Sequence, residues 1–435
     1  MSAELEHVKR MSVTLQSELA VQNVEHSSET KETHKAALRR FFDANNGFPL
    51  MKKNLWFTRS EDDISKWSGL TIDKSTGRVL KMKFKGFGLK ETLSGDGMAQ
   101  MPNMEELDFS HTDLTELPNE VGEMINLHVL KFESCKLLAS LPSIGRLTQL
   151  QKLDLRFCKS LQELPEEIGK LTSLLSLCLW DCSLLTKIPN QIGKCSLLQE
   201  LDCSKCGNLR ELPEEIGGLE NLRSLNLWAC KSLTSLPSSI GKLISLKEMN
   251  LTQLNLTTLP SEIGNLTKLS ELDLSGCKLT SLPVEIANLT SLEELNLSTC
   301  KGLTELPAEI RSLRHNLRVV DLSGCEALVG VDSPLWHLTS LEVLDMSACK
   351  DMTAIPACIW QLSQLVELSL KDCASLMALP SEIRQLTALR KLNLVGCKRL
   401  VSFPPLSHLL PGLQVETYGA SDEVEAWVAR GCKLT

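Results

Sequence analysis

Cysteine is the residue type best able to do chemistry in this chain, because sixteen cysteines occur among its 435 residues. Cys203 and Cys206 have the C-x-x-C spacing of a zinc site or a redox pair. A tetrahedral zinc site needs two further ligands, and no histidine or second cysteine pair completes such a set. We therefore expect no metal site.

Other catalytic patterns are missing from the sequence. It contains no G-x-x-x-x-G-K-[ST] loop, no G-x-G-x-x-G after a strand, no H-E-x-x-H and no kinase signature, and its eight histidines are scattered. Aspartates recur with a regular period, which favours a solvated stripe over a set of acid–base partners: Asp154, Asp202, Asp273, Asp321 and Asp345. We expect a protein that is not an enzyme and holds no cofactor.

The cysteines belong to a repeat. Eleven of them stand at the ninth place of a unit of about 24 residues: Cys135, Cys158, Cys182, Cys206, Cys230, Cys277, Cys300, Cys325, Cys349, Cys373 and Cys397. The units begin at Val79, Met104, Leu127, Leu150, Leu174, Leu198, Leu222, Leu246, Leu269, Leu292, Leu317, Leu341, Leu365 and Leu389, with a last strand-like start at Leu413. Such a repeat predicts a solenoid, in which each coil buries its apolar side against its neighbours.

Residues 222–245 show how one coil is built. Leu222, Leu225 and Leu227 alternate with polar positions at the end of their segment, as in a short strand with one buried face. Cys230 turns inward, Pro237 ends the extended run, and the returning limb buries its own apolar side chains. The cysteine thiol can donate to backbone carbonyls that the chain exposes as it leaves the strand. Neighbouring coils lie about 4.8 Å apart, which is too far for a relaxed disulfide, so we expect a reduced ladder.

This spelling resembles leucine-rich repeats over residues 79–412. The resemblance implies an α/β leucine-rich repeat solenoid: a curved right-handed coil with a parallel sheet on the concave face and short helical or 3-10 segments on the convex face. The convex spelling L-P-x-x-I-G-x-L is similar to plant intracellular Ras-group repeat proteins, and strand ends such as Ser275-Gly276-Cys277 resemble repeat regions of plant disease-resistance proteins. Both resemblances imply a protein-recognition surface.

Four segments are expected. Residues 1–30 predict a flexible tail, residues 31–78 an N-terminal cap, residues 79–412 a solenoid of about 14 repeats, and residues 413–435 a C-terminal cap. In the first cap, Ala37, Leu38, Phe41 and Phe42 share one helical face. In the second, Ser421 precedes an acidic first turn, which is typical of a helix start. The W-x-G element at Trp67 resembles plant-type caps but lacks the cysteines of secreted members, which favours an intracellular protein.

Charge and targeting patterns limit the partners and the location. The formal net charge is −8 without a basic block, so we expect no nucleic acid. There is neither a signal-peptide pattern nor an apolar stretch of membrane-spanning length. Cys432-Lys433-Leu434-Thr435 has the form of a prenylation box, although Lys433 and Thr435 fit it poorly. We expect a monomeric cytoplasmic protein, with the nucleus or the plasma-membrane periphery as alternatives.

A candidate binding surface stands out at the seventh and eighth repeat positions. The seventh position is small and polar in most coils, as at Ser204, Thr252, Ser275, Ser298, Ser323 and Ser347. Larger residues replace it, with unusual neighbours, between Leu150 and Ser245; the candidate protein-binding residues are Arg156, Phe157, Trp180, Asp181, Lys205 and Trp228. Tryptophan and arginine dominate interface hot spots. The alternative is that the tryptophans pack along the strand surface and only stabilise the fold.

The sequence therefore predicts an intracellular scaffold or recognition module that binds a protein partner on its concave face, in signalling or defence. Two other functions stay open: an extracellular receptor-type ectodomain, and a regulatory subunit or inhibitor of an enzyme.

Overall fold

The computed structural model describes residues 32–45, 67, 69–85, 89–328, 333–404 and 412–429. The chain forms two compact units, Met1–Leu174 and Leu175–Thr435. The predicted tail at residues 1–30 lies outside the described residues, and so does Cys432.

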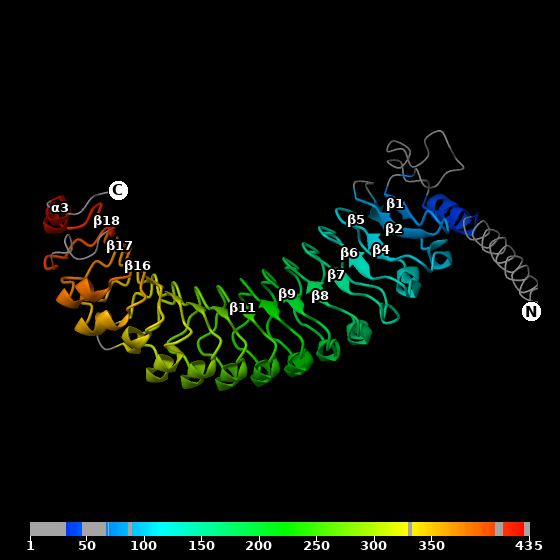
Figure 1. Ribbon diagram of the computed structural model, residues 1–435. Coiled ribbons are helices and arrows are strands. Elements are labelled where there is room, and N and C mark those ends of the chain that lie inside the picture. The colour runs from blue at the N-terminus through cyan, green and yellow to red at the C-terminus, as the bar shows by residue number, and fades with distance from the viewer. Residues whose placement is uncertain are drawn as a thin grey trace, which may run out of the picture. The chain divides into compact units, whose positions relative to one another are not determined.

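In the first unit, residues 32–44 form the predicted helix, drawn in blue in Figure 1. Ala37, Leu38, Phe41 and Phe42 are buried, which confirms the predicted apolar face. The helix ends before Asn45, whose side-chain amide donates to the carbonyl of Ser94 at 3.0 Å and accepts from its N–H at 2.8 Å. This pair of bonds ties the end of the helix to the first coils.

The main strands of the first unit are mostly parallel. The first two strands are antiparallel to each other and the rest are parallel, in the order β1 (Leu70–Ile72), β2 (Val79–Lys83), β4 (Glu106–Asp108), β6 (Val129–Lys131) and β7 (Lys152–Asp154). A separate parallel pair consists of β3 (Lys90–Glu91) and β5 (Asp113–Leu114). The 3-10 helices are η2 (Met98–Gln100), η3 (Asn119–Glu123) and η4 (Glu166–Lys170).

Phenylalanines replace leucine in the core of the first coils. Phe84, Phe109 and Phe132 stack nearly parallel, with ring centroids 4.9 and 5.6 Å apart. Phe41 of the N-terminal helix packs on the open end of this stack, 5.7 Å from Phe84. The helix therefore shields the first coil, because an uncovered solenoid end would expose these rings to water.

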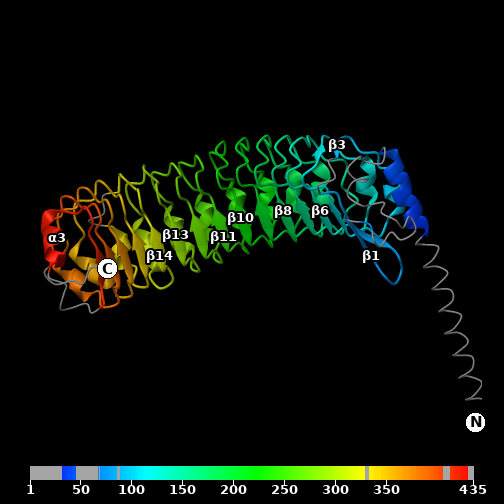
Figure 2. The same cartoon turned by 90° about the horizontal axis from the view of Figure 1, so that it is seen from above.

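The second unit is a row of parallel strands, which lie side by side in Figure 2. They pair in sequence order as β8 (Ser176–Cys178), β9 (Glu200–Asp202), β10 (Ser224–Asn226), β11 (Glu248–Asn250), β12 (Glu271–Asp273), β13 (Glu294–Asn296), β14 (Val319–Asp321), β15 (Val343–Asp345), β16 (Glu367–Ser369), β17 (Lys391–Asn393) and β18 (Gln414–Glu416). The surface that their solvent-facing residues form is called the sheet face below. Strand β18 confirms the predicted last start at Leu413.

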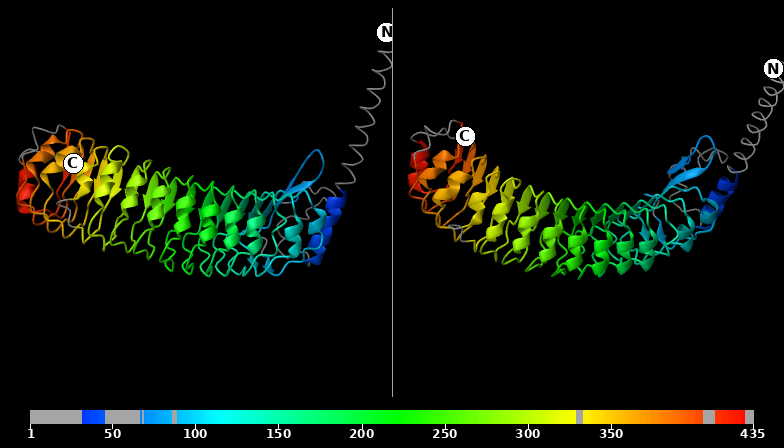
Figure 3. Two further views of the ribbon diagram at one scale, coloured as in Figure 1. Left: turned by 90° about the horizontal axis from the view of Figure 1, so that it is seen from below. Right: turned by 60° about the horizontal axis from the view of Figure 1, so that its bottom comes forward.

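The returning limbs of the second unit are 3-10 helices on the side opposite the strands (Figures 1 and 3). They are η5 (Asn190–Lys194), η6 (Glu214–Gly218), η7 (Ser238–Lys242), η8 (Ser261–Asn265), η9 (Val284–Asn288), η10 (Ala308–Leu313), η11 (Pro334–His337), η12 (Ala357–Gln361) and η13 (Ser381–Gln385). An extended proline precedes most of them, such as Pro237 before η7, because its fixed φ suits the entry to a helix. The unit ends with helix α3 (Asp422–Ala429), whose Val424 is buried, and Ser421 caps its first turn.

The core follows the repeat template. In the coil from Leu222, the template positions Leu222, Leu225, Leu227, Cys230 and Ile240 are buried. The predicted solenoid with a parallel sheet and 3-10 turns is therefore confirmed, with modest helical caps. Within the described part of the chain, no helix combines the length and the apolar character needed to cross a bilayer.

The cysteine ladder forms as predicted. Ten of the eleven ninth-position thiols donate to the carbonyl of the sixth residue of the preceding coil, as Cys230 Sγ does to Cys203 O at 3.0 Å. The same bond recurs at Cys135, Cys158, Cys206, Cys277, Cys300, Cys325, Cys349, Cys373 and Cys397. Burial raises the pKa of the Cys277 thiol to about 12 and that of the Cys300 thiol to about 11. The fifteen described cysteines are free thiols.

Candidate functional site

The candidate residues stand where each strand turns into its loop. The eighth repeat position adopts a left-handed backbone there, with φ of 60° at Phe157, 58° at Asp181 and 59° at Lys205. Its N–H donates to the carbonyl of the seventh residue in the next coil, as Lys205 does to Trp228 at 2.6 Å. Non-glycine residues adopt this backbone at a cost, and these bonds between coils help to hold it.

A cation lies between the two tryptophans. The ammonium nitrogen of Lys205 is 4.7 Å from the centroid of the Trp228 ring and 5.7 Å from that of Trp180. We call these three residues the tryptophan–lysine cluster. Lys205 is exposed and both tryptophans are half-buried, so the cluster presents a positive charge on aromatic rings to the solvent.

The tryptophans also pack over the strand between them. Ser204, at the seventh position of the middle coil, is only 2% exposed, whereas Ser275 and Ser298 at the same position of other coils are half-buried. The difference arises because small residues flank Ser275 and Ser298, while Trp180 and Trp228 flank Ser204. Part of each ring surface therefore packs within the fold, and part stays exposed to solvent.

Arg156 and Phe157 belong to the first unit, where Arg156 is occupied by ion pairs. Its guanidinium donates to both oxygens of Asp154, at 2.8 Å for the closest contact, and to Glu133 at 3.4 Å. Asp154 is 2% exposed. Arg156 thus neutralises a buried carboxylate, a structural role that the sequence did not indicate. Asp181, by contrast, lies half-buried in the second unit, next to Trp180 in the chain.

The aspartate stripe is not simply a solvated surface, and this prediction needs correction. At the fifth repeat position, a side-chain oxygen accepts the N–H of the residue two places on: Asp202 accepts from Ser204 at 2.9 Å, and Asn226 from Trp228 at 3.0 Å. The same bond forms at Asp154, Asp273, Asp321 and Asp345. The alternation of aspartate with asparagine at this position could have revealed the role, because both side chains accept this bond and both favour turns.

The sheet of the first unit carries a compensated charge cluster. Glu106 accepts from Lys131 at 2.8 Å and from Lys81 at 3.0 Å, and Lys83 is 3.7 Å away. Burial by itself would raise the pKa of Glu106, but the bonds from Lys131 and Lys81 outweigh it and hold the pKa at about 2. This carboxylate is ionised at neutral pH and fully paired.

The Cys203-Cys206 pair is part of the core. Both side chains are buried, and Cys206 donates to the carbonyl of Leu179 at 3.2 Å. Among the residues that the structure describes, no group of three or more histidine, cysteine or acidic side chains is arranged to hold a metal ion.

Comparisons with known proteins agree with this architecture. The family model described as a leucine-rich repeat region matches residues 138–235 and 221–326. A solved leucine-rich repeat protein of Leptospira interrogans is 31% identical, with a TM-score of 0.65; the match covers 80% of this chain and 90% of that one. No curated protein sequence matches the chain.

A second solved structure shares the fold alone. A chain in the Toll–Spatzle complex of Drosophila is 20% identical, with a TM-score of 0.58, over 75% of this chain. The match spans about half of that longer chain, 49% of its length.

Proposed function

The chain belongs to the leucine-rich repeat proteins, and from that premise we propose that it is a non-enzymatic recognition module that binds a protein partner on the sheet face of its second unit. Leucine-rich repeats are protein–protein interaction modules. The partner's contact centre is proposed at the tryptophan–lysine cluster.

One observation carries the choice of site. The cluster replaces the small polar residues of the template by two half-buried rings and an exposed cation. A half-buried tryptophan offers a partner a large apolar area, and its side-chain conformation is already restricted. Both properties are typical of hot spots. Lys205 adds a charge that can meet a carboxylate of the partner, because its ammonium group is exposed.

We also propose that the protein works in a reducing compartment such as the cytoplasm. Cysteines throughout the core act as thiol donors to backbone carbonyls, and a disulfide would remove the donated proton. A role in signalling or defence is a further proposal, and it rests on the repeat spelling alone.

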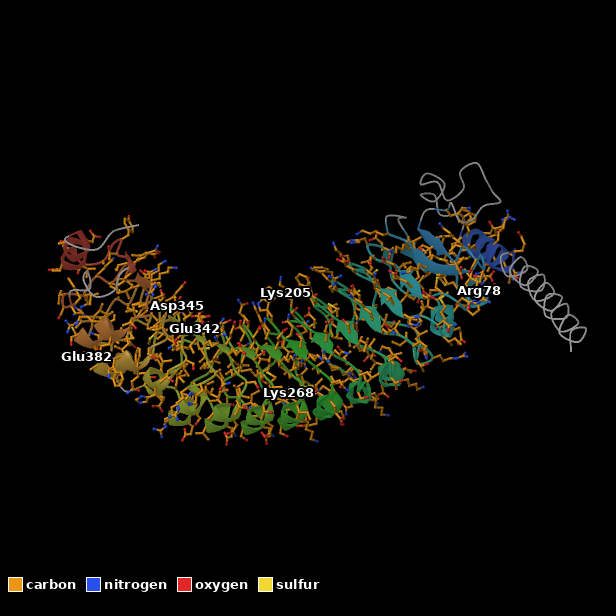
Figure 4. All side chains as sticks on the ribbon, viewed as in Figure 1. Arg78, Lys205, Lys268, Glu342, Asp345 and Glu382 are labelled. Carbon is orange, nitrogen blue, oxygen red and sulfur yellow. The ribbon has the colours of Figure 1, made fainter. Side chains whose placement is uncertain are left out.

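Site-directed photocrosslinking tests the proposed contact centre. A benzophenone side chain at Gln253, an exposed position in the coil next to Trp228, should form a covalent adduct with the partner in extracts of the source cells. The same group at Lys268, which lies on the opposite side of the unit from Lys205 in Figure 4, should form none. Adding Trp180→Ser and Trp228→Ser to the Gln253 variant should abolish the adduct.

The size of the effect separates recognition from folding. Each serine substitution should weaken partner binding by about 2 kcal/mol, or about 30-fold, and leave the melting curve cooperative. A double variant that unfolds would show that the tryptophans are structural. Equal adducts from positions 253 and 268, or full binding by a folded double variant, would place the contact centre elsewhere.

A further inference from the structure

The sheet face of the second unit contains an acidic hollow. Its volume is about 410 Å³, and it lies over strands β10 to β14. Five carboxylates line it, with neither lysine nor arginine among the described lining residues: Glu248, Glu271, Asp273, Glu294 and Asp321. The hollow starts at Ser224 to Asn226, in the same coil as Trp228 of the tryptophan–lysine cluster.

Three of these carboxylates repel one another. Glu248, Glu271 and Glu294 are paired in register on neighbouring parallel strands, which places equal charges on strands about 4.8 Å apart. Burial, together with the charges of Glu248 and Glu294, raises the pKa of Glu271. No described residue forms an ion pair with any of the three. Asp273 and Asp321, in contrast, each use an oxygen to accept a backbone N–H.

In the first unit, a glutamate at the same repeat position has its charge paired within the fold. Glu106 stands at the third position of its coil, as Glu248, Glu271 and Glu294 do, and it is paired with Lys131 and Lys81. Nothing in the template prevents a lysine beside the three glutamates, since Lys81 and Lys131 occupy strand positions next to β4. The described residues of the second unit supply no counter-charge to the three glutamates, which points to a counter-charge on another molecule.

We propose that the acidic hollow binds an extended, basic segment of a partner protein, whose lysine or arginine side chains pair with Glu248, Glu271 and Glu294. This inference rests on the proposed function and specifies the chemistry of the partner. The hollow spans five strands, about 19 Å, which matches about six residues of extended chain. Its carboxylates would repel nucleic acid, and a net charge of −8 disfavours a second copy of this chain.

A charge-matched pair of variants tests the proposal. Glu248→Gln, Glu271→Gln and Glu294→Gln are combined in one protein, and Glu211→Gln, Glu305→Gln and Glu309→Gln, three exposed glutamates outside the hollow, in a control with the same net charge. The probe is a fluorescent ten-residue peptide of alternating lysine and serine, titrated by anisotropy at about 50 mM salt, where surface charges are weakly screened.

The native protein and the control should bind the peptide equally, and the hollow variant at least tenfold more weakly. The hollow variant should melt no lower than the native protein, because the substitutions remove repulsion. Equal weakening in both variants would show that the peptide senses only net charge, and equal binding would show that it does not use the hollow. Either result overturns the inference, as would tight binding of a glutamate–serine peptide.

The two proposals can fail separately. Loss of peptide selectivity with intact crosslinking at position 253 would remove the basic partner and keep the contact centre. Selective peptide binding without a crosslink at position 253 would keep the acidic site and remove the contact centre.

Discussion

The ammonium nitrogen of Lys205 lies 4.7 Å from the centroid of the Trp228 ring, in a coil whose neighbour on the other side supplies Trp180. Two tryptophans spaced two coils apart would leave a gap, and the lysine side chain lies in it. An exposed cation over an aromatic ring contributes about 0.5 to 1 kcal/mol. The cluster is therefore organised before any partner binds.

A double-mutant cycle measures this contact. The unfolding free energies of Lys205→Met, Trp228→Leu and the double variant should give a coupling of about 0.5 to 1 kcal/mol. The control cycle pairs Trp228→Leu with Lys231→Met, an exposed lysine three residues along the chain, and should give a coupling near zero. Equal couplings in the two cycles would mean that Lys205 does not interact specifically with the ring.

The left-handed corner makes glycine valuable at the eighth repeat position. Gly396 has a φ of +72°, and an added Cβ would lie 2.1 Å from Oδ1 of Asp372. Gly396→Ala should therefore lower the unfolding free energy by about 1 to 2 kcal/mol. Gly207→Ala is the control, because nothing lies within 4 Å of its added Cβ, and chemical denaturation should find it neutral or slightly stabilising. Equal losses in both variants would rule out backbone strain as the cause.

The ion pairs of Glu106 should make stability depend on acid. The folded pKa of about 2 is below the ordinary value of 4.5, so the stabilisation is complete above pH 4.5 and is lost as the pH falls towards 2. Glu106→Gln should cost about 2 kcal/mol at pH 7 and flatten the pH dependence of unfolding in that window. Glu105→Gln changes an exposed neighbour and should keep the native profile. An unchanged acid profile in Glu106→Gln would contradict this assignment.

The thiols of the ladder should react only slowly with thiol reagents in the folded protein. Burial raises the pKa of ladder thiols such as Cys277 and Cys300, so little thiolate forms there near neutral pH, and thiolate is the reactive species. In a Cys432→Ser background, a thiol reagent should react quickly only with the half-buried Cys178 and Cys358. After denaturation without reductant, all fifteen remaining thiols should react. A count that is lower by two thiols or a multiple of two would reveal disulfides and contradict the proposed reducing compartment.

The structure of one coil follows from its residue pattern. Leucines, a cysteine such as Cys230 and an isoleucine such as Ile240 recur at fixed places in the repeats. Each contacts equivalent residues about 24 positions away, so the repeat pattern identifies the core residues. Pro237 and its equivalents predicted where each returning limb begins, because proline acts through its own backbone. The apolar face of residues 32–44 and the thiol donors of the ladder were predictable for the same reason, since periodicity and bonding capacity belong to the residues themselves.

How side chains of neighbouring coils combine depends on the way the coils stack. Arg156 was predicted as an interface residue from its size alone, and only its register against Asp154 and Glu133 shows that it is also an ion-pair partner within the first unit. Lys205 was singled out for its place beside the tryptophans, yet its position over both rings depends on the φ of its corner. Glu106 and Glu271 occupy the same repeat position, and the residues on the adjoining strands leave one paired and the other repelled. Such differences depend on lateral register, which the strands acquire when the coils stack.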